Sequence, residues 1–110
     1  LKVIPGLVDV HSHGAFGHDF SDADPEGLKV ILKYEKRHGI TSYCPTSMTL
    51  PAEELKEIFS TIKMVGELED GATVQGINME GPFLDPKKKG AHVEGYIRKP
   101  DAGFFRELNT

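Results

Sequence analysis

The chain has 110 residues, of which 38% are hydrophobic and 27% charged, which is the size and composition of one globular domain. The formal net charge of −4 arises from mixed charges without a basic stripe, so we expect a small-molecule partner, no nucleic acid and no membrane. One cysteine cannot form an internal disulfide, and no apolar run approaches the roughly 20 residues of a membrane helix, which favours a cytoplasmic location.

The first predicted element is a strand over residues 7–13, which follows a proline and a glycine. Its residues alternate between apolar and polar types with a period of two. Because side chains in a strand point alternately to its two faces, we expect the valines on one face and Asp9, His11 and His13 on the other.

Two helices and two further strands are predicted along the rest of the chain. A helix with Asp24 as its N-cap ends at Gly39, and residues 40–45 favour a second strand that is ended by a proline. Pro51 opens a second amphipathic helix, and residues 73–80 predict a third strand.

The order of these elements indicates consecutive βαβ units and a parallel sheet, hence the α/β class. Strands begin near residues 7, 40 and 73, and this spacing of about 33 is close to the roughly 31 residues per unit of an eight-stranded (β/α)8 (TIM) barrel. A doubly wound sheet is the alternative, but the glycines after the first strand do not follow GxGxxG. We therefore expect residues 1–110 to form the first three βα units of a TIM barrel, an incomplete barrel domain.

His11 and His13 are the first candidate metal ligands. On one strand face their backbones would be roughly 7 Å apart, so that both imidazoles can reach one ion at the strand end where barrel active sites lie. Such a pair suits Zn(II), Fe(II), Co(II) or Mn(II), and Asp9 on the same face is expected to orient a ring. The alternative is an incidental pair of histidines.

Glu80 and His92 are the other candidates. Glu80 ends the third strand, where it is expected either to bind metal or simply to reach solvent. The connection 81–100 is far longer than the usual strand-to-helix loop of about 2–6 residues, which is typical of a lid or binding loop. His92 is its only histidine, and can donate a hydrogen bond or proton near neutral pH.

Several other residues have structural explanations. The lysines of the long loop are interpreted as a solvated run rather than an anion site. His38 lies at a helix C-terminus, where a cation is favourable, and His18 follows a glycine-rich turn. Cys44 is expected to pack within the second strand.

Four segments together carry a resemblance to a known family: PGLVDVHSHG, GITSYCPTSMT, MEGPFLDPKKKGAH and YIRKPD. They resemble the metal-dependent amidohydrolase superfamily and, within it, the N-acetylglucosamine-6-phosphate deacetylase family. The resemblance implies a distorted eight-stranded barrel that hydrolyses an N-acetyl group on an amino-sugar phosphate to glucosamine 6-phosphate and acetate.

The resemblance also implies roles for individual residues. Glu80 matches the principal metal ligand, and His11 with His13 matches the HxH pair of members that hold two ions, so one or two divalent ions are implied, with Zn or Fe favoured. His92 matches a catalytic, substrate-contacting histidine that polarises the scissile carbonyl, and Ala91 matches a substrate-contacting backbone position. A homo-oligomer, a dimer in the full-length family, is implied as well.

Further metal ligands and the catalytic aspartate would come from later strands, so we expect the 110 residues to be an inactive fragment of such an enzyme. Two alternatives stay open. One is another amidohydrolase, such as a cyclic amidase of the dihydroorotase type. The other is a non-catalytic barrel fragment that self-associates through its open sheet edges.

Overall fold

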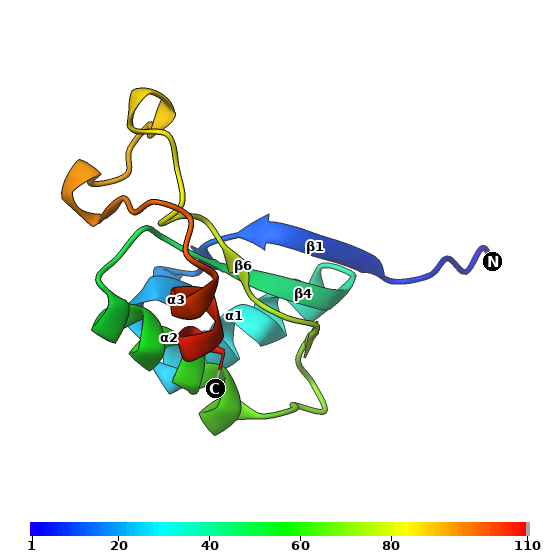
Figure 1. The fold of residues 1–110 in the computed structure, drawn as a ribbon. Helices are drawn as coiled ribbons and strands as arrows, with labels where there is room; N and C mark the ends of the chain where they lie inside the picture. Colours follow the sequence, from blue (N-terminus) through cyan, green and yellow to red (C-terminus); the bar gives the residue numbers. More distant parts are fainter. Residues whose placement is uncertain (110) are drawn as a thin grey trace.

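A computed structural model describes residues 1–109 and has an α/β fold built on a parallel sheet (Figure 1). The central strand is β4 (Ile40–Ser47). On one side it pairs with β1 (Leu7–Ser12), and on the other with two short strands, β5 (Thr73–Val74) and β6 (Asn78–Met79). All of these pairings are parallel, which confirms the predicted α/β class and strand direction.

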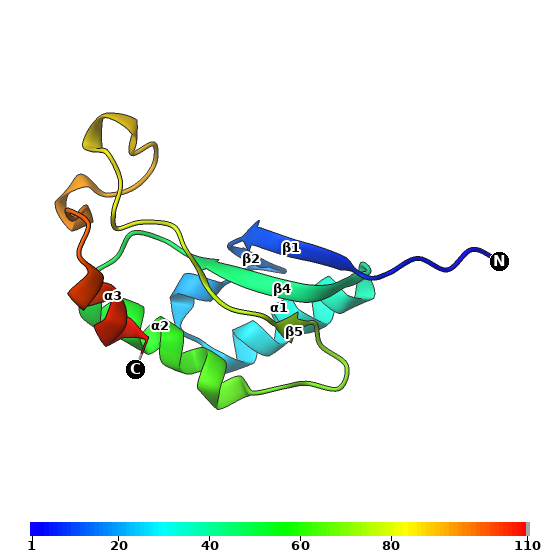
Figure 2. The same cartoon turned by 45° about the vertical axis from the view of Figure 1, so that its right-hand side comes forward.

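Three helices cover one face of this sheet, as Figure 2 shows. They are α1 (Pro25–Arg37), α2 (Ala52–Val65) and α3 (Ala102–Leu108). Their apolar stripes meet the sheet around Tyr43 of β4, which is fully buried. Burying each Leu, Ile or Phe side chain in such a core contributes about 1.5–3 kcal/mol. The core consists of Phe20, Leu28, Ile31, Leu32, Tyr43, Leu55, Ile58, Ala72, Phe104 and Leu108.

The helix ends lie where the sequence signals predict them. The Asp24 side chain accepts a hydrogen bond from the Glu26 N–H at 3.0 Å, and so satisfies one free donor of the first turn of α1. The chain leaves that helix through Gly39 with φ of +88°, a conformation that other residues adopt only with strain. Pro51 directly precedes α2, and Gly66 follows it.

Two strand predictions need correction. β4 does not stop at Pro45 but continues to Ser47, and Pro45 itself pairs with Ser12 of β1. Pro45 has no backbone N–H to donate to β1, and beside it side chains of β4 bind Ser12 instead: the Tyr43 hydroxyl donates to the Ser12 carbonyl at 3.0 Å, and the Thr46 hydroxyl accepts the Ser12 N–H at 3.1 Å. The predicted third strand is divided into β5 and β6. Val74 pairs with Tyr43 and Asn78 with Thr46, so the segment between these pairs has one residue more than the facing segment of β4. This extra residue forms a bulge around Gly76.

A second bulge corrects the predicted face of Asp9. Asp9 pairs with Tyr43 and Ser12 with Pro45, so β1 has one residue more than β4 between these two pairs. The alternation of side chains between the two faces of β1 therefore shifts between Asp9 and the histidines. Asp9 pairs with the core residue Tyr43, and its carboxylate accepts the backbone N–H of His11 at 2.9 Å instead of orienting an imidazole.

The remaining elements are short. A hairpin of β2 (Gly14–Ala15) and β3 (His18–Asp19) follows β1, and the 3-10 turn η1 (Phe20–Asp22) leads into α1. The long connection contains only the 3-10 turns η2 (Pro86–Lys88) and η3 (Glu94–Tyr96). Among residues 1–109, no helix has the length and apolar character needed to span a bilayer.

Candidate metal and substrate site

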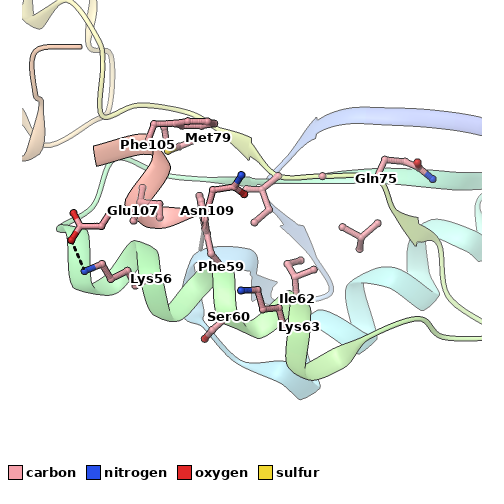
Figure 3. A pocket seen from close by; sticks show the side chains of 14 residues that line it. Lys56, Phe59, Ser60, Ile62, Lys63, Gln75, Met79, Phe105, Glu107 and Asn109 are labelled. Atoms are coloured by element: carbon pink, nitrogen blue, oxygen red, sulfur yellow. Dashed lines mark ion pairs between the residues drawn. The ribbon is translucent and has the colours of Figure 1, made fainter. Parts of the chain in front are cut away.

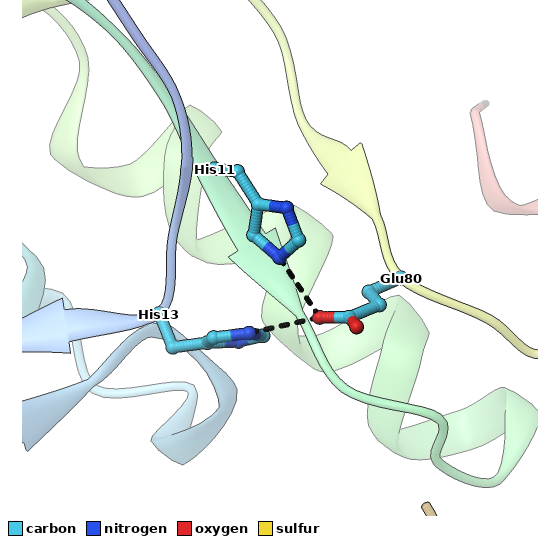
Figure 4. A group of neighbouring side chains, drawn as sticks. All are labelled: His11, His13 and Glu80. Atoms are coloured by element: carbon cyan, nitrogen blue, oxygen red, sulfur yellow. Dashed lines mark hydrogen bonds and ion pairs between the residues drawn. The ribbon is translucent and has the colours of Figure 1, made fainter. Parts of the chain in front are cut away.

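Three histidines surround the carboxylate of Glu80. Oε2 of Glu80 lies 3.0 Å from Nε2 of His11 and 2.9 Å from Nε2 of His13 (Figure 4). Its other oxygen, Oε1, lies 3.2 Å from Nε2 of His92. The sequence-predicted side chains, which come from β1, the end of β6 and the long loop, are therefore brought together at one place.

Strand geometry explains why these residues meet. His11 lies in β1 and His13 directly follows it, while Glu80 directly follows β6. The two strands run parallel on either side of β4, so their carboxyl ends lie at the same edge of the sheet. That edge is where parallel α/β folds build their sites.

The Thr46 carbonyl determines the protonation of His13. Nδ1 of His13 lies 3.1 Å from this oxygen, which can only accept a hydrogen bond, so neutral His13 carries its proton on Nδ1. Nε2 is then the nitrogen left to bind a metal ion, and without an ion its 2.9 Å contact with Oε2 of Glu80 needs a proton between the two atoms. A backbone carbonyl that fixes the far nitrogen in this way is the usual support of a metal-binding imidazole.

His92 has the opposite arrangement. The Thr49 backbone N–H donates to Nδ1 of His92 at 3.4 Å, so the proton of a neutral His92 ring lies on Nε2 and points to Glu80. The side chain is only 8% exposed, and Lys89 holds its backbone, since Nζ of Lys89 donates to the His92 carbonyl at 3.1 Å. His92 is thus built as a hydrogen-bond donor rather than as a metal ligand.

Glu80 is held through its backbone as well. Its N–H donates to the Ser47 carbonyl at 3.2 Å, and its carbonyl accepts the Thr49 hydroxyl at 3.2 Å. Gly81, which follows, has φ of +81°, and a Cβ at this position would collide with Oγ1 of Thr49. The glycine of the EGPF segment is therefore required by both conformation and space.

The charge state of Glu80 results from opposing effects. Partial burial alone would raise the pKa of its carboxyl group, but hydrogen bonds from His11 and His92, together with the charges of His11 and His13, outweigh burial and hold the pKa below its ordinary value. Glu80 is consequently ionised at neutral pH and presents an anionic oxygen ligand.

These residues fit a divalent metal ion. One nitrogen each from His11 and His13 and one oxygen of Glu80 all lie within 4.8 Å of one another. A neutral imidazole with a free Nε2 and an ionised carboxylate are the donor types that Zn or Fe sites use. When no ion is bound, the attraction between the Glu80 carboxylate and the imidazoles accounts for the same contacts.

The other predicted residues lie as follows. Ala91 is exposed beside the buried His92 and precedes it at the same turn of the loop. His18 lies 4.0 Å from Asp24 at the start of α1, outside the cluster. Nδ1 of His38 contacts the Tyr34 carbonyl at the end of α1, and Cys44 is a partly buried free thiol in β4.

A second concave region lies away from these histidines. It is a groove of about 720 Å³ between α2, α3 and the β5–β6 segment, with Phe59, Ile62, Met79 and Phe105 among its lining residues (Figure 3). Its ionisable lining groups are Lys56, Lys63 and Glu107. The groove therefore lacks the metal-ligand and proton-transfer groups of the His–Glu cluster.

Comparison with known proteins gives a consistent result. No protein-family model matches the chain. The N-acetylglucosamine-6-phosphate deacetylases of Mus musculus and Homo sapiens are each 37% identical to it over 107 residues, a match that covers 94% of this chain and 26% of each relative. The Bacillus subtilis deacetylase is 30% identical over 109 residues.

Solved deacetylase structures share the fold. The Thermotoga maritima enzyme superposes with a TM-score of 0.80 at 30% identity, covering 94% of this chain and 28% of that one. The Mycobacterium smegmatis enzyme gives 0.82 at 31% identity, over 96% of this chain and 27% of that one. A variant of that enzyme was crystallised with N-acetyl-D-glucosamine-6-phosphate.

The α/β fold and its parallel sheet thus match part of an amidohydrolase structure. The chain is homologous to N-acetylglucosamine-6-phosphate deacetylases, which confirms the resemblance drawn from the motifs. It spans about a quarter of the length of the relatives it matches.

Proposed function

We propose that this chain supplies metal ligands and part of the substrate site of a deacetylase that hydrolyses N-acetylglucosamine 6-phosphate to glucosamine 6-phosphate and acetate. The observation that carries the proposal is the meeting of His11, His13 and His92 around the single carboxylate of Glu80. In this proposal residues 1–110 are the first three βα units of a TIM barrel, and further ligands and the catalytic aspartate come from later strands.

His11, His13 and Glu80 would hold one or two divalent ions, with Zn or Fe favoured by the donor set. Such an ion, when bound, supplies Lewis acidity and lowers the pKa of coordinated water. The protein's part is to present these donors preorganised. The Thr46 carbonyl holds Nδ1 of His13 as a donor and leaves Nε2 for the ion, and before an ion binds the neighbouring imidazoles keep Glu80 ionised.

His92 would contact the substrate. Its Nε2–H is directed by the Thr49 N–H on the far side of the ring, and the side chain is almost fully buried, so its donor has a fixed direction. In this proposal the donor passes from Oε1 of Glu80 to the substrate, where it would stabilise negative charge that develops on the acetamide carbonyl oxygen. Ala91, an exposed residue adjacent to it, would contact the amino sugar through its backbone.

The remaining predictions accompany this function. The amino-sugar phosphate that a relative was crystallised with is the proposed small-molecule partner, and a cytoplasmic location and a homo-oligomer go with it. The lysines of the loop keep their interpretation as a solvated run: Lys87 and Lys88 are exposed, and Nζ of Lys89 donates to the His92 carbonyl.

A chimaeric enzyme tests the function. Replacing the matching 107 residues of the Mus musculus deacetylase with this chain should give a protein that releases acetate from N-acetylglucosamine 6-phosphate, and His13→Ala in the chimaera should abolish release. The 110-residue chain alone is expected to release none. A folded chimaera that opens dihydroorotate but spares the amino sugar would favour a cyclic amidase instead.

A non-catalytic, self-associating fragment is the second candidate, and one observation favours it. Leu7, Val8 and Val10 of the edge strand β1 are 57%, 63% and 60% exposed. An apolar edge strand is prone to pairing with another copy. Light scattering after size exclusion should then show an oligomer that Val8→Lys dissociates, and a monomeric unsubstituted chain would contradict this candidate.

A further inference from the structure

We propose that Thr49 is a positioning residue, which sets the geometry of Glu80 and His92 without touching the reacting atoms. The inference rests on the proposed function, because it concerns the same site. Thr49 follows β4 by two residues and is only 3% exposed, so both of its polar groups need partners within the protein.

Both partners of Thr49 are residues of the site. The hydroxyl donates to the backbone carbonyl of Glu80 at 3.2 Å, and the backbone N–H donates to Nδ1 of His92 at 3.4 Å. One buried residue thus connects the residue proposed to bind metal with the one proposed to bind substrate, although these are twelve positions apart in the sequence.

The hydroxyl contact acts at the point where Glu80 is oriented. The Glu80 carbonyl belongs to the peptide that joins it to Gly81, where φ is +81° and a Cβ would strike the Thr49 hydroxyl. Thr49 therefore packs directly against the turn that follows the strand. Removing its hydroxyl leaves the carbonyl without this donor and lets the peptide rotate, which changes the direction of the Glu80 side chain.

The backbone N–H of Thr49 acts on His92. Because Nδ1 of His92 accepts from Thr49, the ring presents Nε2–H to the site, whereas Nδ1 of His13 donates to the Thr46 carbonyl, so that neutral His13 has its free nitrogen at Nε2. The residues at the end of β4 thus give two neighbouring histidines opposite tautomers. One suits a metal ligand and the other a hydrogen-bond donor.

Zinc binding by the 110-residue chain tests the role, through titration against a chromophoric chelator. Thr49→Val removes the hydroxyl at nearly constant volume, and Thr49→Ser keeps it. Thr61→Val is the matched control, since Thr61 is 1% exposed and its hydroxyl donates to the Glu57 carbonyl at 3.0 Å within α2, away from the site. Thermal unfolding of the same proteins separates loss of stability from loss of positioning.

The expected result is a zinc dissociation constant about tenfold higher for Thr49→Val, the size of effect usual for residues that orient ligands. Thr49→Ser should bind within about twofold of the unsubstituted chain, since its hydroxyl restores the bond. Thr61→Val should lower the melting temperature without changing affinity. Equal affinity of Thr49→Val and Thr61→Val would overturn the positioning role and leave the proposed function intact. No zinc binding by the unsubstituted chain would overturn the role of these residues as a metal site in the chain itself, and the positioning role with it, whereas the proposed function is decided separately by acetate release from the chimaera.

Discussion

His92 and Glu80 meet through one specific pair of atoms, Nε2 of the imidazole and Oε1 of the carboxylate, which lie 3.2 Å apart. His11 and His13 contact the opposite oxygen, Oε2. The two oxygens of one side chain thus separate two kinds of imidazole. On the Oε2 side are the candidate ligands, and on the Oε1 side is a buried donor.

The tautomers of His13 and His92 are the first testable consequence. In the zinc-bound chain, ¹⁵N imidazole spectra should show a proton on Nδ1 and none on Nε2 for His13, and a proton on Nε2 for His92. The internal control is His38, whose Nδ1 lies 2.8 Å from the Tyr34 carbonyl and must therefore carry a proton. Identical tautomers for His13 and His92 would contradict the division of roles.

Glu80→Gln should weaken zinc binding. The substitution keeps the shape of the side chain but removes the anionic oxygen that faces His11 and His13, so affinity should fall more than about tenfold. Calorimetric titration of the chain with zinc measures the change. Glu94→Gln, at an exposed position of η3, is the control and should bind like the unsubstituted chain. Full affinity in Glu80→Gln would remove Glu80 from the ligand set.

The sequence predicted where the candidate ligands would lie because period-two alternation and strand ends depend on local pattern. His11 and His13 lie on one short stretch and Glu80 ends the predicted third strand, so only the direction of the strands is needed to place them at one edge. The parallel order supplied that direction. The contact between Glu80 and His92, by contrast, depends on the path of a long loop that has no periodic pattern.

The two bulges could not be predicted for a different reason. A bulge is a mismatch between paired strands, so it is a property of the register and not of either segment alone. The bulge in β1 moved Asp9 from the ligand face toward Tyr43, and the one near Gly76 divided the third strand. The support of His13 and His92 by Thr46 and Thr49 was missed too, because it uses a backbone carbonyl and a backbone N–H that every residue type possesses.

Gly81→Ala should destabilise the protein and the site together. The positive φ of +81° strains any side chain by about 1–3 kcal/mol, and the new methyl group would also collide with Thr49. Denaturant unfolding measures the loss of stability, and zinc titration measures the loss at the site. Gly95→Ala is the control, since a Cβ there meets no atom within 4 Å, and it should change neither quantity. A Gly81→Ala protein as stable as Gly95→Ala would show that the turn tolerates a side chain.

Glu35→Gln should raise stability in a pH-dependent manner. Burial, followed by the negative charge of Asp9, raises the pKa of the Glu35 carboxyl above its ordinary value of 4.5, and the opposing charge of His38 does not cancel this. The folded state thus binds the proton more tightly than the unfolded state, so this group's stabilising contribution is complete below pH 4.5 and is lost as pH rises through the raised pKa.

Glutamine has no charge to bury, so at pH 7 the variant should be more stable by on the order of 1 kcal/mol, and the difference should vanish in acid. Thermal unfolding from about pH 4 to pH 8 measures it, over a range that brackets the ordinary carboxyl and histidine pKa values. Glu57→Gln, on the exposed face of α2, is the control and should show no such trend. A Glu35→Gln variant whose advantage grew toward acid would mean that Glu35 is stabilised as a carboxylate by a partner, the reverse of the environment described above.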